Sequence, residues 1–371
     1  MVPTDRRTLL ATLGAGTAGL AGCLGGRASS GVFGGDEAER DGRTGGSGGS
    51  GPTPPTVNRS LPTAYGVAEL VDASQSGGPE PDGIPAIENP RFVEASDAAG
   101  TLEENDPVFG VELGGEAKAY PQSILVWHEI VNDVIGGRPV SVTYCPLTGT
   151  AQGFHRGETT FGVSGQLINA NLVMFDRGSE SWWPQILSTA ITGDDAGRHL
   201  EEFQVVWTTW SRWRSTYPDT VVLTEETGFA RNYGRDPYGE YNPRQGYYDD
   251  DSFIFGPLTE DDRLHPKATV IGMRSEHGAV AIRNETLREE RLLPFELGGN
   301  AHLAVYDADL DTGYVYRVDD PNTPSPSWEN GRVVIDGIDH EPTNLPYERE
   351  IAFDAMWFAW YGYYPMTTLH A

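Results

Sequence analysis

One stretch of the chain, from Tyr120 to Arg156, brings together the residue types that most often carry chemistry. It contains His128, Glu129 and Cys145, and the only other cysteine in the chain is Cys23. A cysteine thiolate is a strong nucleophile when a neighbouring histidine lowers its pKa, and a carboxylate can orient that histidine. One interpretation is therefore a catalytic set made of Cys145, His128 and Glu129.

Two other interpretations of the same thiol remain open. Cys145, His128 and His155 would together suit a soft or borderline metal ion, although neither histidine stands in a recognised ligand spacing. Alternatively, Cys145 is a small buried residue at the end of a strand. The zinc-protease motif is excluded, because Asn132 occupies the place of its second histidine. The side chains that we expect to bind a small ligand in the same cleft are Asn132, Asp133, Tyr144, His155 and Trp182.

The element expected to position His128 is a helix that starts at Pro121, where a missing N–H costs nothing, and runs to about Val134. Apolar residues cover more than half of its circumference, which predicts a buried helix. In such a helix His128 and Asn132 lie at i and i+4, as do Glu129 and Asp133. A Gly-Gly turn at 136–137 then leads into an alternating strand that ends at Cys145.

The remaining body reads as strands with a few buried helices, which predicts a β-rich α+β fold. Gly114-Gly115 joins two strands in a hairpin, and Asp336-Gly337 gives a second hairpin signal. Helices are expected at 209–217 and from Phe353 to Tyr361, where aromatic residues have helical spacing. Further strands are predicted at 159–165, 171–176, 220–223 and 315–318.

An internal sequence similarity predicts that a β-rich unit is duplicated. Residues 92–125 align with 254–287 at a constant offset of 162, and the identical pairs fall on one strand-turn-strand pattern. We expect a single domain over 61–371 with repeats at 84–262 and 263–371, and a cleft where the repeats meet. The long polar and aromatic loop from Arg231 to Asp251 has no regular period, which is typical of a functional loop or lid. Its tyrosines are groove-like in number and spacing.

The N-terminal residues resemble an export signal. Arg6-Arg7, an apolar small-residue run and then Leu20-Ala21-Gly22-Cys23 match a twin-arginine signal followed by a lipid-attachment site over residues 1–23. We expect Cys23 to carry acyl chains that anchor the chain to the outer face of the cytoplasmic membrane without spanning it. Residues 24–60 are rich in Gly, Ser, Pro and Thr, which predicts a disordered tether.

The charge of the chain excludes one class of partner. It has 26 Lys+Arg against 54 Asp+Glu, a net charge of -28. A surface this acidic repels phosphates, so we expect no nucleic-acid partner. Only two lysines occur, Lys118 and Lys267. This composition is typical of a halophilic protein, because concentrated salt screens the repulsion between carboxylates.

Several large enzyme classes leave no signature in this chain. It contains no phosphate-binding P-loop, no dinucleotide fingerprint and no G-x-S-x-G nucleophile motif. Asp307, Asp309 and Asp311 resemble a calcium loop, but the glycine is one place late and Val318 stands where a glutamate ligand belongs. A hairpin turn is the simpler interpretation of these three residues.

The longest motifs resemble a known family. Residues 120–133 (YPQSILVWHEIVND), 136–154 (GGRPVSVTYCPLTGTAQGF), 208–223 (TTWSRWRSTYPDTVVL) and 356–365 (MWFAWYGYYP) are similar to domain-of-unknown-function family 3179. The family is uncharacterised, so the resemblance implies no reaction. Members typically carry C-P-L-C where this chain has Cys145-Pro146-Leu147-Thr148, so a dithiol or two-cysteine metal clip is absent here.

These observations predict an exported, lipid-anchored domain that binds a small ligand or metal ion in a cleft lined by cysteine and histidine. A thiol-dependent hydrolase or transferase using the same residues is the first alternative. A cell-surface module without catalysis, in which Cys145 is buried, is the second.

Overall fold

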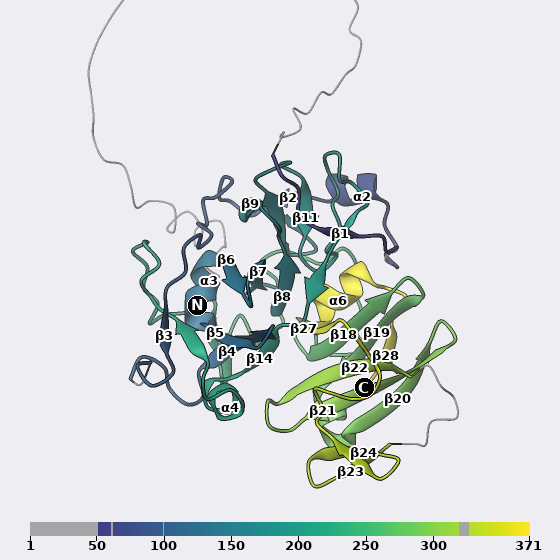
Figure 1. The fold of residues 1–371 in the computed structure, drawn as a ribbon. Coiled ribbons are helices and arrows are strands. Elements are labelled where there is room, and N and C mark those ends of the chain that lie inside the picture. The colour runs from purple at the N-terminus through teal and green to yellow at the C-terminus, as the bar shows by residue number, and fades with distance from the viewer. Residues whose placement is uncertain (1–50, 61, 99, 319–325) are drawn as a thin grey trace, which may run out of the picture.

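The computed structural model describes residues 51–60, 62–98, 100–318 and 326–371. Short strands dominate these residues and five short helices lie between them, which confirms the predicted β-rich α+β class. Figure 1 shows the earlier strands, in blue and teal, beside a second group of strands in green and yellow. The predicted signal over 1–23 lies outside the described residues. Among the helices that are described, none has the length and apolar character needed to cross a membrane.

The order of the elements along the chain repeats once, in the way that the predicted duplication would require. In each unit a hairpin leads directly into a seven-residue helix. Each of these three elements in the second unit starts and ends 162 positions after its counterpart in the first. The first unit has β4 (Pro107–Leu113), β5 (Glu116–Pro121) and α3 (Gln122–His128), and the second has β18 (Thr269–Ser275), β19 (Gly278–Arg283) and α5 (Asn284–Glu290).

A second antiparallel sheet follows each helix. Its strands occur in the same spatial sequence in both units, β6-β7-β8-β13 in the first and β20-β21-β22-β26 in the second. The first-unit strands are β6 (Ile130–Ile135), β7 (Arg138–Cys145), β8 (Thr150–His155) and β13 (Glu202–Phe203). Their counterparts are β20 (Leu292–Leu297), β21 (Asn300–Asp307), β22 (Thr312–Val318) and β26 (Glu348–Glu350).

Each unit closes with a strand, a helix and a strand that runs parallel to the second hairpin strand. These elements are β14 (Val206–Thr209), α4 (Trp210–Thr216) and β15 (Val221–Leu223), repeated as β27 (Ala352–Met356), α6 (Trp357–Tyr363) and β28 (Thr368–His370). The indole of Trp213 lies where a Cβ on Gly110 would be, at 2.2 Å, and Trp360 does the same at Gly272. Glycine is required at both positions because only a residue without a Cβ leaves room for the indole.

The other elements are not repeated. The first unit carries an additional four-stranded sheet of order β11-β10-β9-β2, and short pairs complete the fold. They are β1 (Thr56–Val57), α2 (Val67–Asp72), β2 (Gln75–Ser76), β3 (Phe92–Glu94), β9 (Phe161–Ile168), β10 (Asn171–Asp176), β11 (Trp182–Pro184), β12 (His199–Leu200), β16 (Gly239–Tyr241), β17 (Arg244–Gly246), β23 (Ser327–Glu329), β24 (Arg332–Ile335) and β25 (Ile338–His340).

The two units share one apolar core. Helix α6 of the second unit packs against the first unit, where the Tyr363 hydroxyl donates to the carbonyl of Ile168 at 2.9 Å. Asn169 donates to the carbonyl of Ala359 at 2.7 Å. Buried apolar area is the main stabilising contribution to such a body, and these buried hydrogen bonds set the relative position of the units.

The predicted helix from Pro121 to Val134 is wrong in its second half. Helix α3 ends at His128, and Glu129 adopts a left-handed conformation with φ of 59°. The next residues form β6, whose β-branched side chains favour a strand and whose backbone pairs fully with β7. Asn132 and Asp133 therefore point to opposite faces of a strand and do not share a helical face with His128 and Glu129.

Two other boundaries are corrected. The C-terminal helix starts at Trp357 and not at Phe353, because Phe353 and Met356 belong to β27, which pairs with β18. The predicted tether over 24–60 also ends earlier than expected. Thr56 and Val57 form β1, which pairs with β12, because a backbone with free donors and acceptors can extend an existing strand whatever its side chains.

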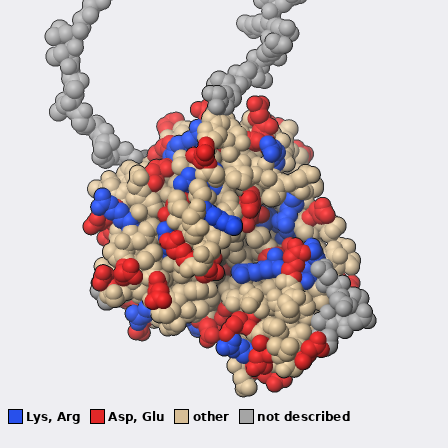
Figure 2. Space-filling model, viewed as in Figure 1, with Lys and Arg blue, Asp and Glu red and all other residues tan. Residues whose placement is uncertain are grey.

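Charge is distributed as the composition implies. Figure 2 shows acidic side chains spread over the drawn face, with basic ones between them. Both lysines are buried, Lys118 at 6 % exposure and Lys267 at 1 %. The described surface therefore carries no exposed lysine, and its permanent positive charge comes from arginine.

Candidate functional site

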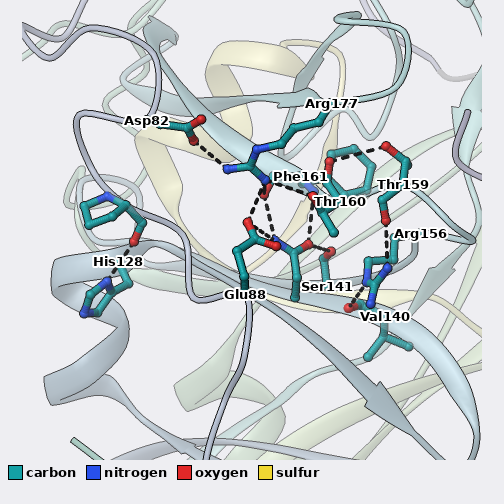
Figure 3. Close-up of polar contacts among 12 residues, drawn as sticks. Asp82, Glu88, His128, Val140, Ser141, Arg156, Thr159, Thr160, Phe161 and Arg177 are labelled. Carbon is teal, nitrogen blue, oxygen red and sulfur yellow. Dashed lines mark hydrogen bonds and ion pairs between the residues drawn. The ribbon is translucent and has the colours of Figure 1, made fainter. Parts of the chain in front are cut away.

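His128, the predicted base, is buried at the end of α3 with both ring nitrogens engaged. Nδ1 lies 2.7 Å from the carbonyl oxygen of Pro85, so this nitrogen carries the proton and donates it (Figure 3). Nε2 lies 2.7 Å from the Tyr233 hydroxyl, which donates to it. Burial lowers the pKa of His128 to about 4, against the opposing effect of the Pro85 hydrogen bond. The ring is neutral at pH 7 and holds two loops together.

Cys145, the predicted nucleophile, is sealed in the core at 1 % exposure. Its thiol donates to the carbonyl oxygen of Ala170, with the sulfur 3.8 Å from that oxygen. A catalytic thiol must be reachable and needs a nearby group that favours the thiolate. The catalytic set of Cys145, His128 and Glu129 therefore stays a prediction, in which His128 is engaged by Pro85 and Tyr233 and the thiol of Cys145 is buried. Glu129, also buried, accepts the N–H of Tyr144 through its backbone carbonyl at 2.8 Å.

The predicted metal site of Cys145, His128 and His155 has no counterpart among the described side chains. In the part of the chain that the structure describes, no three or more His, Cys, Asp or Glu side chains are placed to hold a metal ion. His155 lies at the end of β8, where its ring packs on Phe203 at 5.3 Å and burial lowers its pKa. The two histidines stand on different elements, His128 at the end of helix α3 and His155 at the end of strand β8.

Asn132 and Asp133, predicted ligand-binding residues, serve structural networks. Asn132 donates to the carbonyl of Phe161 at 2.8 Å and accepts the Ser141 hydroxyl at 2.7 Å. Beside it, Arg177 forms ion pairs of 2.7 Å with both Asp82 and Glu88 (Figure 3). On the opposite face, Asp133 pairs with buried Lys118 at 3.1 Å and accepts the Tyr120 hydroxyl at 2.6 Å.

The last two predicted ligand-binding residues differ in position. Trp182 starts β11 and its backbone N–H donates to the Thr192 hydroxyl, so it belongs to the additional sheet of the first unit. Tyr144 lies behind a cleft instead. Its hydroxyl accepts the Gln122 amide at 2.8 Å and is hydrogen-bonded to Tyr248, and burial raises its pKa well above the usual value.

That cleft lies between the two units and has a volume of about 550 Å³. We call it the inter-unit cleft. Its walls come from the first unit (β4, β14 and α4), the second unit (β18, α5, β27 and the turn after β21) and the β16–β17 hairpin. Its polar and charged lining residues include Arg212, Tyr241, Arg244, Lys267, Asn284, Arg288, Asp311 and Asp354.

Asp354, on β27, is the carboxylate that faces into this cleft. Its Oδ1 accepts the Asn284 amide at 2.7 Å. Burial raises the pKa of Asp354 to about 6, against the lowering effect of that hydrogen bond, and Asp311 adds to the increase while Arg244 opposes it. Because the Asn284 nitrogen is directed at Asp354, its Oδ1 points the other way; this oxygen is buried without a hydrogen-bond partner among the described residues.

The cations of the cleft fall into two groups. Arg288 and Lys267 are paired with carboxylates, Asp311 at 2.9 Å and Asp250 at 3.0 Å. Arg212 and Arg244 donate to neutral oxygens only: Arg212 to the carbonyls of Ala308 and Asp309, and Arg244 to acceptors that include the Tyr241 hydroxyl at 2.7 Å. Their charges are thus not neutralised by direct carboxylate contact in the described structure.

The loop from Arg231 to Asp251 contributes Tyr241 and Tyr248 to the lining of the cleft, and most of its tyrosines are buried. Tyr233, Tyr238, Tyr247 and Tyr248 are buried. The Tyr248 hydroxyl donates to Asp236 at 2.8 Å, and burial raises the pKa of Asp236 to about 6. Tyr241 stacks on Trp207 with ring centroids 4.3 Å apart, which attaches the β16–β17 hairpin to the first unit. Another pocket, of about 990 Å³, is lined by Tyr233 and Tyr238 and shares Pro107, Tyr241 and Asn242 with the cleft.

The model of a family described as a protein of unknown function, DUF3179, matches residues 81–367. The chain belongs to this family. Comparison with curated proteins and with solved structures found no match. The DUF3179 match covers both units except strand β28 and includes every cleft residue named above, so the cleft is built within the family's own region.

The cleft residues were missed by reasoning from the sequence, although a signal existed. At the duplicated positions, Asn284, Arg288 and Asp311 correspond to Gln122, Val126 and Gly149 at the offset of 162. In the closing elements, Asp354 occupies the place of Trp207, and Asp307 occupies the place of Cys145. Charged residues that replace apolar or small ones in one copy of a DUF3179 repeat indicate where the copies differ in role.

Proposed function

We propose that the protein binds a small polar solute in the inter-unit cleft. The observation that carries the proposal is the side-chain arrangement around Asp354: a carboxylate with a raised pKa, beside the unpartnered buried oxygen of Asn284, in a cavity built by both units. Binding sites are commonly concave, about 300–1,000 Å³ in volume, and carry a few convergent polar groups and perturbed pKa values.

Binding is better supported than thiol catalysis. The thiol alternative needs a reachable sulfur and a base beside it, whereas Cys145 is buried and His128 is neutral and doubly hydrogen-bonded. A purely structural module would not need a hydrophilic cavity at the junction of its repeats, because an unpartnered buried acceptor destabilises the fold unless something donates to it.

We also propose that the chain is exported by the twin-arginine route and tethered through a lipid on Cys23. The support is the order of Arg6-Arg7, the short apolar run and the Leu20–Cys23 lipid-attachment pattern. Expressed in a cell with that export route, the chain should appear in the membrane fraction and be released by detergent. Cys23→Ser should shift it to the soluble exported fraction, and Arg6→Lys with Arg7→Lys should keep it inside. A Cys23→Ser chain that stays with the membrane would contradict the anchor.

The test of the cleft is a thermal-shift screen of polar metabolites, followed by titration calorimetry on each hit. The experiment uses the region of the protein that the structure describes, in a high-salt buffer. A solute that raises the midpoint for the wild type should lose at least about tenfold in affinity with Asp354→Asn, because one buried charged acceptor is removed.

Glu88→Gln is the matched control. Glu88 is also a carboxyl group whose pKa burial raises, but it pairs with Arg177 away from the cleft. This variant should bind every hit within about twofold of the wild type, since it contacts no part of the cleft. If no solute shows a dependence on Asp354, or if Glu88→Gln loses affinity equally, solute binding in this cleft is wrong.

A further inference from the structure

Resting on the proposed cleft, the geometry points to a ligand that carries both an ammonium and a carboxylate group, as a free amino acid or short peptide does. The cleft offers acceptors without donors at one wall and cations without carboxylate partners at the other. A compound with a single charged group would satisfy one wall only.

The acceptor wall consists of Asp354 and Asn284. The side-chain nitrogen of Asn284 donates a hydrogen bond to Oδ1 of Asp354 at 2.7 Å, and this bond fixes the orientation of both side chains. It leaves the buried Oδ1 of Asn284 without a donor among the described residues, and the only side-chain hydrogen bond to Asp354 within those residues is the one to its Oδ1. An ammonium group has three N–H donors and no acceptor, so it can satisfy both oxygens at once.

The acceptor wall is also selective for a cation. A neutral hydroxyl could donate one hydrogen bond, but it would leave the Asp354 charge uncompensated at neutral pH. A carboxylate or phosphate placed here would meet the charge of Asp354, with Asp311 lining the same cleft, and like charges repel. The chemistry of this wall therefore fits a positively charged donor.

The donor wall consists of Arg212 on α4 and Arg244 on the β16–β17 hairpin, which line the same cleft. The Nη1 of Arg212 donates to the carbonyls of Ala308 and Asp309, at 2.6 and 3.1 Å, which holds the guanidinium in place. Its Nε and Nη2 make no hydrogen bond within the described residues, so one edge of the fork is available. The edge of a guanidinium formed by Nε and Nη2 is the one that binds a carboxylate with two parallel hydrogen bonds.

Arg244 adds a second positive charge near the same wall. It donates to the carbonyl of Lys267 at 2.8 Å and to the hydroxyls of Tyr241 and Thr269. These neutral acceptors leave its charge in place, whereas Arg288, Arg283 and Lys267 already have carboxylate partners. Exposed Asp249 also lines the cleft, and it is not directed at either wall by any contact in the described structure.

The size of the cleft is compatible with this class of ligand. A volume of about 550 Å³ exceeds what one amino acid occupies and leaves room for a side chain or a second residue. Trp207 and Tyr241 line the space between the two walls and offer apolar surface to the middle of the ligand. Recognition would thus come from the two charged ends, with the apolar surface tolerant of different side chains.

The test is a crossed comparison of matched ligands and variants. The panel contains the standard amino acids and a set of dipeptides, and for each binder also the amine without the carboxylate and the acid without the amino group. Titration calorimetry is done on the wild type, Asp354→Asn, Arg212→Gln and the control Glu88→Gln, with circular dichroism used to verify that each variant is folded.

We expect each analogue that lacks either the amino group or the carboxylate to bind the wild type at least about tenfold more weakly than the parent compound. Asp354→Asn should weaken the parent and the amine but leave the acid within about twofold, and Arg212→Gln should weaken the parent and the acid but leave the amine unchanged. This reciprocal pattern would not follow from a general loss of stability.

Three results would overturn the inference, and they differ from failure of the proposed function. If the amine alone binds as well as the parent, the site recognises a cation only; if the acid alone does, it recognises an anion only. If no panel member binds while a solute of another class binds in an Asp354-dependent way, the cleft is a binding site for a different chemistry. If no compound of any class depends on Asp354, both proposals are wrong.

Discussion

The two repeated units share their backbone and differ in what they do with one position. In the first unit Trp207 fills the space beside its sheet and packs on Phe109 and Tyr144, with ring centroids 5.0 and 5.4 Å away. In the second unit the same position is Asp354, which leaves a cavity and places a carboxylate at its wall. A duplicated fold can thus keep one copy for packing, while the other copy forms a polar cleft against it.

The same contrast recurs at the end of the strand that carries the thiol. Cys145 is apolar in character and buried in the first unit. Asp307, its counterpart, accepts the N–H groups of Asp309 and Leu310 at 2.9 and 3.1 Å and so stabilises the β21–β22 turn. The aspartates that resembled a calcium loop are therefore a hairpin turn, as the simpler interpretation predicted.

The strongest test of the difference between the two units is to replace Trp207 and its counterpart Asp354 with alanine. Trp207→Ala should lower the free energy of unfolding by about 3–5 kcal/mol, because it leaves a large cavity in a packed aromatic cluster. Asp354→Ala should cost much less at pH 7, because removing a buried carboxylate with a raised pKa relieves about 1–3 kcal/mol of ionisation cost and so offsets the lost Asn284 hydrogen bond. Chemical denaturation followed by tryptophan fluorescence and circular dichroism measures both. Equal losses would show that the two positions do not differ in role.

A second prediction concerns what the units have in common. Gly110→Ala and Gly272→Ala should each cost about 1–3 kcal/mol or more, because the new Cβ would lie 2.2 Å from Trp213 or Trp360. Gly256→Ala is the control, since no heavy atom lies within 4 Å of the added Cβ. Denaturation midpoints of the three variants give the comparison, and a loss in only one unit would mean that the two tryptophans are not equivalent supports.

A third prediction uses pH to isolate Asp354. Its folded-state pKa, about 6, lies above the usual unfolded value of about 4, so the folded protein favours the protonated form. The destabilisation is complete above pH 6 and disappears as pH falls below about 4, and it amounts to about 1–3 kcal/mol. The difference in unfolding free energy between Asp354→Asn and the wild type should therefore shrink as pH falls from 7 to 4.

Asp236 titrates in the same range, and Asp311 and Arg244 face Asp354, so the wild-type profile alone cannot report on one group. Subtracting the profile of Asp354→Asn removes the shared contributions. A constant difference from pH 7 to 4 would contradict a raised pKa at this carboxyl group.

The smallest expected effect is at Cys145. Iodoacetamide should leave the folded protein unlabelled over the time in which the denatured chain reacts completely, because the thiol is 1 % exposed. Mass spectrometry of the peptide that contains Cys145 measures the labelled fraction. Rapid labelling at pH 7 without denaturant would restore the thiol as a chemical centre and remove the contrast with Asp307.

Local patterns predicted a large part of the fold. The Gly114-Gly115 hairpin, the alternating strand that ends at Cys145 and the helix at 209–217 depend on neighbouring residues, and the structure has all three. The offset of 162 also survives in the bounds of the elements, because insertions that separate the copies lie outside the shared hairpin and helix. The helix after Pro121 was too long in the prediction because pairing with β7 overrides the apolar helical pattern of Ile130 and Val131.

The candidate site was predictable only in its general place. The expectation of a cleft between the repeats agrees with the cavity found there, but the residues assigned to it were chosen by chemical type within one short stretch. His128 and Cys145 are reactive when exposed, and neither composition nor spacing reports that each is enclosed by partners distant in sequence, Tyr233 and Ala170. Arg212 and Asp354, by contrast, have no local motif at all.

The sequence by itself determined the strand-rich class, the turns and the two copies of one unit, since backbone preferences and side-chain periodicity act over a few residues at a time. Only the tertiary structure decided which polar groups are free to meet a ligand. Arg212, Arg244, Asn284 and Asp354 come from four separate elements, and they face one cavity because the shared core holds the two units together. Burial and partner choice depend on that packing, and the same packing encloses the thiol and the histidine.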